Sequence, residues 1–220
     1  MPAPAFHPGP DGLPATFSVF PLEGALLLPG GHLPLNIFEP RYLAMVQDAL
    51  GEGRMFGMIQ PDPAAPEGAA GPGLYRIGCL GRVSAFSETE DGRLLITLAG
   101  LARFAVAEEL PMRNGYRRIR GDIAPFRADL AESDVAIDRT RLTEAMRAFF
   151  RARRIEANWD AVTATADAQL VTTLAMICPF PPAEKQALLE APDTAARAEM
   201  LVALMEMGAH GDPAGPHAPS

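Results

Sequence analysis

Lysine, histidine and cysteine, which carry much of nucleophilic and metal chemistry, are scarce in this sequence. The 19 lysines and arginines include a single lysine, Lys185. It lies in the helix-forming stretch PAEKQALL, with no glycine-rich turn before it, which excludes a phosphate-binding loop of the GxxxxGK[ST] type. A serine–lysine catalytic pair would also need Lys185, but its neighbours Glu184 and Gln186 predict an exposed helix surface. We therefore expect neither nucleotide hydrolysis nor lysine-dependent proteolysis.

The histidines and cysteines do not form a recognisable catalytic or metal-binding pattern. Three of the four histidines lie in Pro/Gly/Ala-rich ends of the chain, which leaves His32 alone in the central part. Cys79 and Cys178 stand in apolar surroundings without a CxxC spacing, so we predict buried free thiols. A thiolate pair with His32 is the weaker alternative. No GxSxG motif is present. We expect no catalytic residues, no metal and no cofactor.

Two clusters of charged residues could bind ligands. The acidic cluster is Glu88, Glu90 and Asp91, at the expected tip of a hairpin, where acids are usually solvated. The basic cluster is Arg113, Arg117, Arg118 and Arg120. It could hold an acidic peptide or a phosphate, but a solvated edge strand protected by charge is the favoured interpretation. The net charge of −8 argues against non-specific nucleic-acid binding, which depends on phosphate neutralisation.

The bulk composition is that of a soluble globular protein, with 48% hydrophobic and 21% charged residues. No apolar run is long enough to cross a bilayer. The amino terminus lacks the basic residue and apolar core of a secretory signal. We therefore predict a cytoplasmic protein without a membrane partner. Residues 1–15 and 209–220 are rich in Pro, Gly and Ala, and we expect them to be disordered tails.

Residues 16–127 carry mainly strand signals. Short apolar runs occur at 17–22, 26–29 and 55–60, and the strongest strand pattern spans 75–110. Asp91-Gly92 suits a tight hairpin turn, and Gly100 predicts a bend in the returning strand. With a last strand at 116–123, about six strands are expected, enough to form a barrel. The loop at 61–73 is too rich in proline and glycine for a strand or helix.

Residues 128–208 carry helical signals. A stripe of apolar residues from Leu142 to Phe150 predicts one helix, and Leu170, Leu174 and Ile177 mark a second. Pro182 opens a third helix, and Asp193 caps a fourth that ends at Gly208. The sequence therefore predicts an α+β protein, with a β-rich subdomain at 16–127 and a helical subdomain of about four helices at 128–208.

The segment LPLNIFEPRY, residues 33–42, joins an apolar extended run to a helix start. Pro40 suits the first helical position, and Glu39 lies near the positive end of the helix dipole. We expect Glu39 and Arg41 to brace this corner and Phe38 and Tyr42 to belong to the core. The alternative is that the barrel face beside the corner binds an apolar peptide, with the 61–73 loop as a flap.

Through this segment and others along its length, the chain resembles the substrate-binding domain at the amino terminus of Lon proteases. The resemblance extends over residues 17–50, 56–59, 75–83, 91–104 and 184–205. Its motif residues, which we expect to be structural, are Pro34, Phe38, Glu39, Pro40, Arg41, Tyr42, Gly92, Arg93, Gly100, Arg103 and Phe104. The sequence departs from the family at Asn36, where histidine is frequent, and in the insertion at 61–73.

The resemblance implies a PUA-like β pseudobarrel packed against a helical bundle, and a protein that binds unfolded or hydrophobic protein segments. The chain is similar to stand-alone bacterial proteins that carry only this domain. An adaptor in protein quality control is therefore the expected function, with a Lon protease as a candidate partner. The alternative is a PUA-like small-molecule or RNA-binding protein. Candidate ligand contacts are Asn36, Arg117, Arg118 and Arg120.

Overall fold

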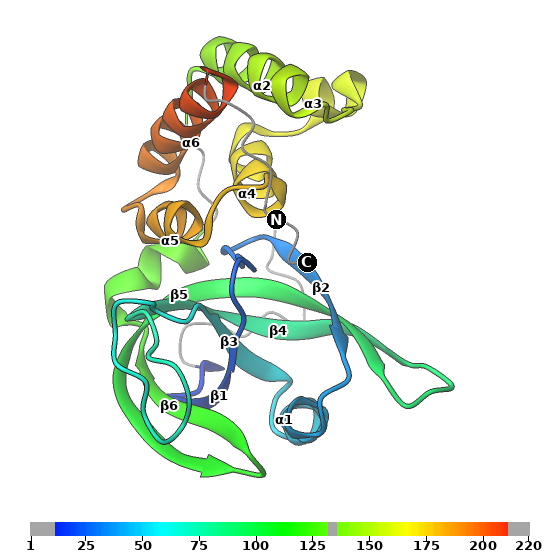
Figure 1. The fold of residues 1–220 in the computed structure, drawn as a ribbon, viewed down its shortest axis with the longest axis vertical. Coiled ribbons are helices and arrows are strands. Elements are labelled where there is room, and N and C mark those ends of the chain that lie inside the picture. The colour runs from blue at the N-terminus through cyan, green and yellow to red at the C-terminus, as the bar shows by residue number, and fades with distance from the viewer. Residues whose placement is uncertain (1–11, 132–135, 211–220) are drawn as a thin grey trace, which may run out of the picture.

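The computed structural model describes residues 12–131 and 136–210. The strands in these ranges are β1 (Thr16–Pro21), β2 (His32–Ile37), β3 (Met55–Ile59), β4 (Ile77–Glu88), β5 (Leu94–Arg113) and β6 (Tyr116–Asp122). The helices are α1 (Pro40–Gly51), α2 (Arg139–Arg153), α3 (Trp159–Ala164), α4 (Asp167–Ile177), α5 (Pro182–Glu190) and α6 (Thr194–His210), with a 3₁₀ segment η2 (Ala124–Leu130). Helices α2 to α6 gather on one side of the sheet, and α4 and α5 lie nearest to it (Figure 1). The predicted α+β fold is confirmed.

The sheet closes on itself through its longest strand. Its order is β2-β5-β4-β3-β1-β6, with a further pairing between β5 and β6. The first part of β5 pairs with β2, from Leu94 to Ala99, and its second part pairs with β6, from Ala105 to Arg113. Since β6 also pairs with β1, it has a partner on both sides. The prediction that the arginine-rich strand β6 is a solvated edge is therefore wrong.

The barrel interior is small and filled by two phenylalanines and four aliphatic side chains. Its buried cluster consists of Phe17, Val19, Ile59, Leu80, Phe104 and Ile119. The rings of Phe17 and Phe104 meet edge to face, with centroids 5.0 Å apart. A Cβ on Gly78 would lie 2.4 Å from Cζ of Phe104 and 2.6 Å from the carbonyl oxygen of Met58. Glycine at this position therefore makes room for the Phe104 ring.

The segment at 26–29 is not a strand, although its apolar run predicted one. Its leucines, Leu26 to Leu28, are buried in an irregular segment that crosses β5. The amide of Gly30 donates to the carbonyl of Gly100 at 3.0 Å, and the amide of Gly100 donates to the carbonyl of Gly31 at 2.8 Å. A Cβ on Gly100 would lie 2.0 Å from the carbonyl oxygen of Leu28. Gly100 is thus required by this close crossing, next to a register shift in β5.

One hydrophobic core joins the strands to the helices. It runs from Phe20 and Leu98 in the sheet to Leu188 in α5 and Met205 in α6. Polar contacts reinforce this junction: Nζ of Lys185 donates to the carbonyl oxygen of Gly24 at 2.8 Å. Lys185 is half-buried, so its prediction as an exposed residue is wrong.

The glutamine beside it was also predicted to be exposed, and that prediction is wrong too. Gln186 is buried, and its Oε1 accepts a hydrogen bond from Nε2 of Gln60 at 3.1 Å. Its own Nε2 donates to the carbonyl oxygen of Ile77 at 3.1 Å. Helix α5 therefore turns a polar face towards the barrel as well as an apolar one.

The helical part departs from the prediction in number and in bounds. Five α-helices follow the sheet within the described residues, because the short α3 was not predicted. Helix α6 also passes Gly208 and reaches His210. Residues 1–11 and 211–220 of the predicted tails lie outside the described residues. Leu13, by contrast, packs against the barrel cluster. No helix in residues 12–131 or 136–210 combines the length and apolarity needed to span a bilayer.

Candidate functional site

The corner at 33–42 is built as expected, but its side chains divide between core and surface. Pro40 occupies the first turn of α1, and Glu39 precedes it without a side-chain capping bond. Oε2 of Glu39 lies 2.9 Å from Nη2 of Arg41, with both side chains about half exposed. Tyr42 is buried, and its ring packs on that of Phe20 with centroids 4.2 Å apart. The expected corner brace is therefore a surface ion pair beside a buried tyrosine.

Phe38 is 62% exposed, so its prediction as a core residue is wrong. The reason is the period of two along β2, in which Ile37 points into the core and Phe38 points away from it. Asn36 and Pro34 share this outward face and are exposed. Asn36 pairs in register with Leu95, which is 46% exposed. A small outward apolar surface thus lies beside the corner, with the candidate contact Asn36 on it.

The basic cluster is largely neutralised by acidic partners. Arg117 is buried, and its Nη2 donates to both carboxylate oxygens of Glu109 at 2.7 and 2.8 Å. Its Nη1 donates to the carbonyl oxygen of Pro72 at 2.6 Å, which ties down the predicted flap at 61–73. Arg120 lies 3.5 Å from Glu108, with both side chains exposed. Of the candidate contacts on β6, only the half-buried Arg118 has no ion pair within the described residues.

Arg103, predicted only as a motif residue, connects the barrel to the helices. Its Nε and Nη2 donate to the two carboxylate oxygens of Asp129 at 2.9 and 2.8 Å. The same guanidinium donates to the carbonyls of Leu189, Ala191 and Pro192 at the end of α5. Arg103 is 4% exposed, so this network is almost fully removed from water.

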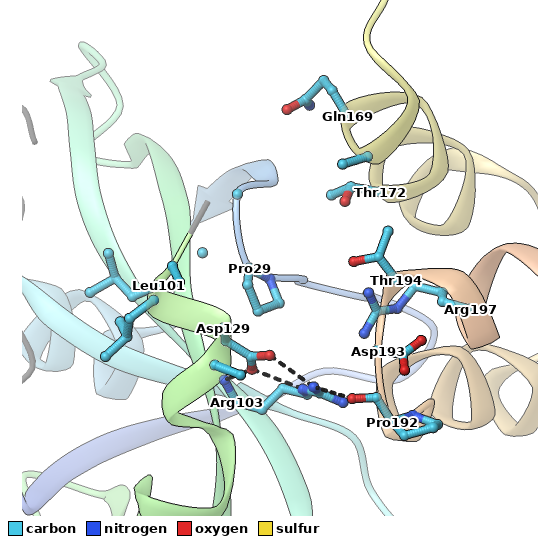
Figure 2. A pocket seen from close by; sticks show the side chains of 16 residues that line it. Pro29, Leu101, Arg103, Asp129, Gln169, Thr172, Pro192, Asp193, Thr194 and Arg197 are labelled. Atoms are coloured by element: carbon cyan, nitrogen blue, oxygen red, sulfur yellow. Dashed lines mark hydrogen bonds and ion pairs between the residues drawn. The ribbon is translucent and has the colours of Figure 1, made fainter. Parts of the chain in front are cut away.

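A cavity of about 330 Å³, here called the junction pocket, lies beside this network between β5, η2, α4 and the start of α6. Its lining includes Pro29, Leu101, Arg103, Asp129, Thr172 and Arg197 (Figure 2). Arg197 is 4% exposed, and its Nε donates to the carbonyl oxygen of Leu188 at 2.8 Å. Burial, together with the positive charge of Arg103, lowers the pKa of Arg197 to about 10.

A second cavity of about 320 Å³, here called the helical groove, lies between α2, α3 and α4. Its lining is predominantly apolar and comprises Met146, Phe150, Ile155, Glu156, Ala157, Asn158, Ala161, Val162, Thr165, Leu170, Thr173, Leu174, Ile177, Cys178 and Pro179. Ile177 stands at the last turn of α4 and is 67% exposed, whereas Leu170 and Leu174 on the same helix are buried. Leu170, Leu174 and Ile177 all lie on α4, as predicted, but Ile177 is the last residue of the helix and is exposed.

The reactive side chains of the sequence are poorly placed for chemistry. Cys79 and Cys178 are both buried and free, as predicted. Burial raises the pKa of Cys79, and burial also raises the pKa of Cys178 to about 12, which disfavours the nucleophilic thiolate. Burial lowers the pKa of Lys185. Within residues 12–131 and 136–210, no group of three or more His, Cys, Asp or Glu side chains is suited to hold a metal ion.

Two residues that line the cavities, Arg197 and Ile177, were not among the predicted ligand contacts. Arg197 lies four residues before Leu201 and eight before Met205, so helical spacing puts it on the buried face of α6. A lone arginine on that face was a usable signal. The exposure of Ile177 was harder to predict, because it lies only three residues after the buried Leu174 on the same helix.

The closed barrel with its layer of helices defines a PUA-like α+β protein. A family model described as the ATP-dependent protease La (LON) substrate-binding domain matches residues 16–207. The chain therefore belongs to the LON substrate-binding domain family. No protease or ATPase domain takes part in this match.

Related proteins and solved structures agree with this assignment. The Lon protease of Anaeromyxobacter dehalogenans is 25% identical over 210 residues, which cover 92% of this chain and 25% of that protein. The chain thus spans about a quarter of the length of this protein and of Lon protease 2 from Myxococcus xanthus, which is 25% identical over 198 residues. A Lon N-terminal domain protein from Xanthomonas campestris is 25% identical with a TM-score of 0.59, covering 86% of this chain and 97% of the other. The N-terminal domain of a Mycobacterium avium complex Lon protease shares the fold, at 16% identity, a TM-score of 0.60 and coverage of 86% and 97%.

Proposed function

We propose that this chain recognises protein segments with exposed apolar side chains, and that the helical groove holds those side chains. The observation that carries the proposal is an apolar groove with Ile177 exposed at its rim, in a member of the LON substrate-binding domain family. An unfolded segment would bury its apolar side chains against Ile177, Phe150 and Leu174. Such burial supplies most of the driving force for association between proteins.

The role that follows is that of a non-enzymatic adaptor in protein quality control in the cytoplasm. A Lon protease is the partner to which bound segments would be presented, because relatives of this chain carry the name Lon protease. RNA is the weaker candidate ligand. The net charge is −8, and Arg117 and Arg120 of the basic cluster already face carboxylates.

The test compares binding of a fluorescein-labelled, reduced and carboxymethylated test protein to the chain and to its Ile177→Asp variant, by fluorescence anisotropy. Burying one isoleucine side chain on binding stabilises a complex by about 1.5–3 kcal/mol, so we expect affinity to fall by about 10- to 100-fold. The matched control is Met207→Asp, because Met207 is 61% exposed and lies outside the groove lining.

The outcome that supports the proposal is a loss of affinity in Ile177→Asp and not in Met207→Asp. Equal affinities for all three proteins would show that the groove is not used. Equal losses in both variants would indicate a response to negative charge alone. A steep decrease of affinity with salt would also count against apolar capture, because burial of apolar surface depends little on screening.

A further inference from the structure

Arg197 directs the Nη nitrogens of its guanidinium into the junction pocket (Figure 2). Its side chain is more than nine-tenths buried, and Nε is occupied by the carbonyl oxygen of Leu188. Among the described residues, neither Nη1 nor Nη2 has a hydrogen bond or an ion pair. Figure 2 shows the guanidinium directed from α6 towards Pro29 and the interior of the pocket. A buried guanidinium is costly unless its donors are satisfied.

The acidic groups of the pocket are engaged elsewhere. Asp129 accepts two hydrogen bonds from the Arg103 side chain and a third, at 3.0 Å, from the Arg103 amide. Asp193 accepts a hydrogen bond from the amide of Ala196 at 2.8 Å and so caps α6. Each carboxylate therefore has its own hydrogen-bond donors, and neither accepts a hydrogen bond from Arg197, although the negative charges of both favour its charged form. The Nη donors of Arg197 are left for a ligand.

The surroundings of Arg197 favour an anion with an apolar body. The pocket includes Thr194, the first residue of the seventeen-residue helix α6, whose amino-terminal end carries partial positive charge. The hydroxyl of the buried Thr172 adds a polar group to the same wall. Pro29 and Leu101 provide apolar surface on the barrel side. The volume of about 330 Å³ suits a small molecule or the last residue of a chain.

We propose that the junction pocket binds a carboxylate carried on a small apolar body, and that the two free Nη groups of Arg197 hold the carboxylate in bidentate fashion. Arginine matches a planar carboxylate with two parallel hydrogen bonds, which lysine or glutamine does not reproduce. This site is separate from the helical groove, since the two cavities are lined by different faces of α4. Binding of an acid in the junction pocket can therefore be tested independently of the binding of apolar segments in the helical groove.

The experiment titrates the whole chain with N-acetyl-leucine and with its amide by isothermal calorimetry, and repeats the comparison with an acetylated peptide ending in leucine as acid or as amide. We expect the acids to bind at least about tenfold more tightly than the amides. Binding by the free acid alone identifies a small-molecule ligand, and binding by the peptide acid alone identifies a chain terminus. Acid and amide binding equally, or no binding at millimolar concentrations, would overturn the proposal.

The variant Arg197→Gln is expected to reduce acid binding to the level of the amide. Arg120→Gln is the matched control, because it removes the same charge from an exposed side chain outside the pocket. A folded Arg197→Gln variant that binds the acid as the unaltered chain does would refute the role of Arg197. If this variant does not fold, methyl NMR of the unaltered chain decides: the acid must shift the signals of Leu101 and Leu130, and shifts elsewhere only would contradict the site.

Discussion

Replacing Arg103 by methionine tests how the barrel is joined to the helices. Methionine retains an apolar stem of similar length but removes the guanidinium. This removes two hydrogen bonds to the Asp129 carboxylate and the bonds to three carbonyls at the end of α5. The side chains of Arg103 and Asp129 are only 5% and 10% exposed, so water cannot replace the lost partners fully.

Breaking a buried ion pair by removing one partner typically costs about 3–5 kcal/mol, and we expect a loss of this size in the free energy of unfolding of Arg103→Met at neutral pH. Urea unfolding followed by far-ultraviolet circular dichroism measures the loss. The double variant Arg103→Met/Asp129→Asn should lose less than the sum of the single variants, by about 1–3 kcal/mol, because the two side chains interact directly.

The control for this series is Arg93→Met, at the residue just before β5. Arg93 lies 2.8 Å from Asp91, but both side chains are about half exposed, so the urea midpoint should not change measurably. A loss below about 1 kcal/mol in Arg103→Met, or additive losses in the double variant, would refute the account of the junction.

Three further outcomes are expected. Gly78→Ala should lower the free energy of unfolding by about 1–3 kcal/mol, measured by urea unfolding, because the added Cβ would lie 2.4 Å from the ring of Phe104. Burial and a hydrogen bond to a neighbouring carboxylate raise the pKa of Tyr116 to about 12, and burial also raises the pKa of Tyr42. A spectrophotometric titration at 295 nm should therefore show a tyrosine that ionises near pH 12, assigned to Tyr116. Since its ordinary pKa is 10.0, its contribution to stability is complete below that pH and is lost as the pH rises to about 12. The thiols of Cys79 and Cys178 should react with a disulfide reagent at pH 8 only after unfolding, because burial raises both pKa values.

Each of these outcomes has a control and a contradicting result. Gly51→Ala adds a Cβ that meets nothing within 4 Å in a helix, so it should not destabilise, and equal losses at both glycines would contradict the packing argument. Tyr116→Phe should remove the tyrosine that ionises near pH 12 and reduce the loss of stability above pH 10, leaving the contribution of Tyr42. An unchanged titration and an unchanged loss of stability in this variant would contradict the assignment to Tyr116. Rapid labelling of the native protein would show that the thiols are accessible.

The strands were predictable where burial alternates along the chain. Leu94, Ile96 and Leu98, alternate residues within the predicted strand region at 75–110, are all buried. Asp91-Gly92 forms the predicted turn, with Gly92 at a φ of +77°. The apolar run from Leu26 to Leu28 indicates burial, but nothing in it distinguishes a strand from an irregular buried segment. The backbone pairing of its neighbours with Gly100 depends on a crossing that no local pattern reveals.

The candidate sites were less predictable than the fold because their residues come from distant segments. Arg103 donates to carbonyls 86 to 89 residues further along the sequence, and the residues around Arg103 do not indicate these partners. Helix α3 has only six residues and none of them is buried, so it has no apolar stripe to predict it. The groove that α3 helps to line was therefore invisible in the sequence, as was the position of Ile177 at its rim.

The most direct test of apolar-segment recognition is a methyl NMR titration of the isoleucine-labelled chain with the unfolded test protein. We expect shifts at Ile155 and Ile177, which line the helical groove. We expect none at Ile59 and Ile119, which lie inside the barrel cluster. Shifts that spare both groove residues, or no shifts under conditions where the test protein binds, would contradict the claim that the groove recognises apolar segments.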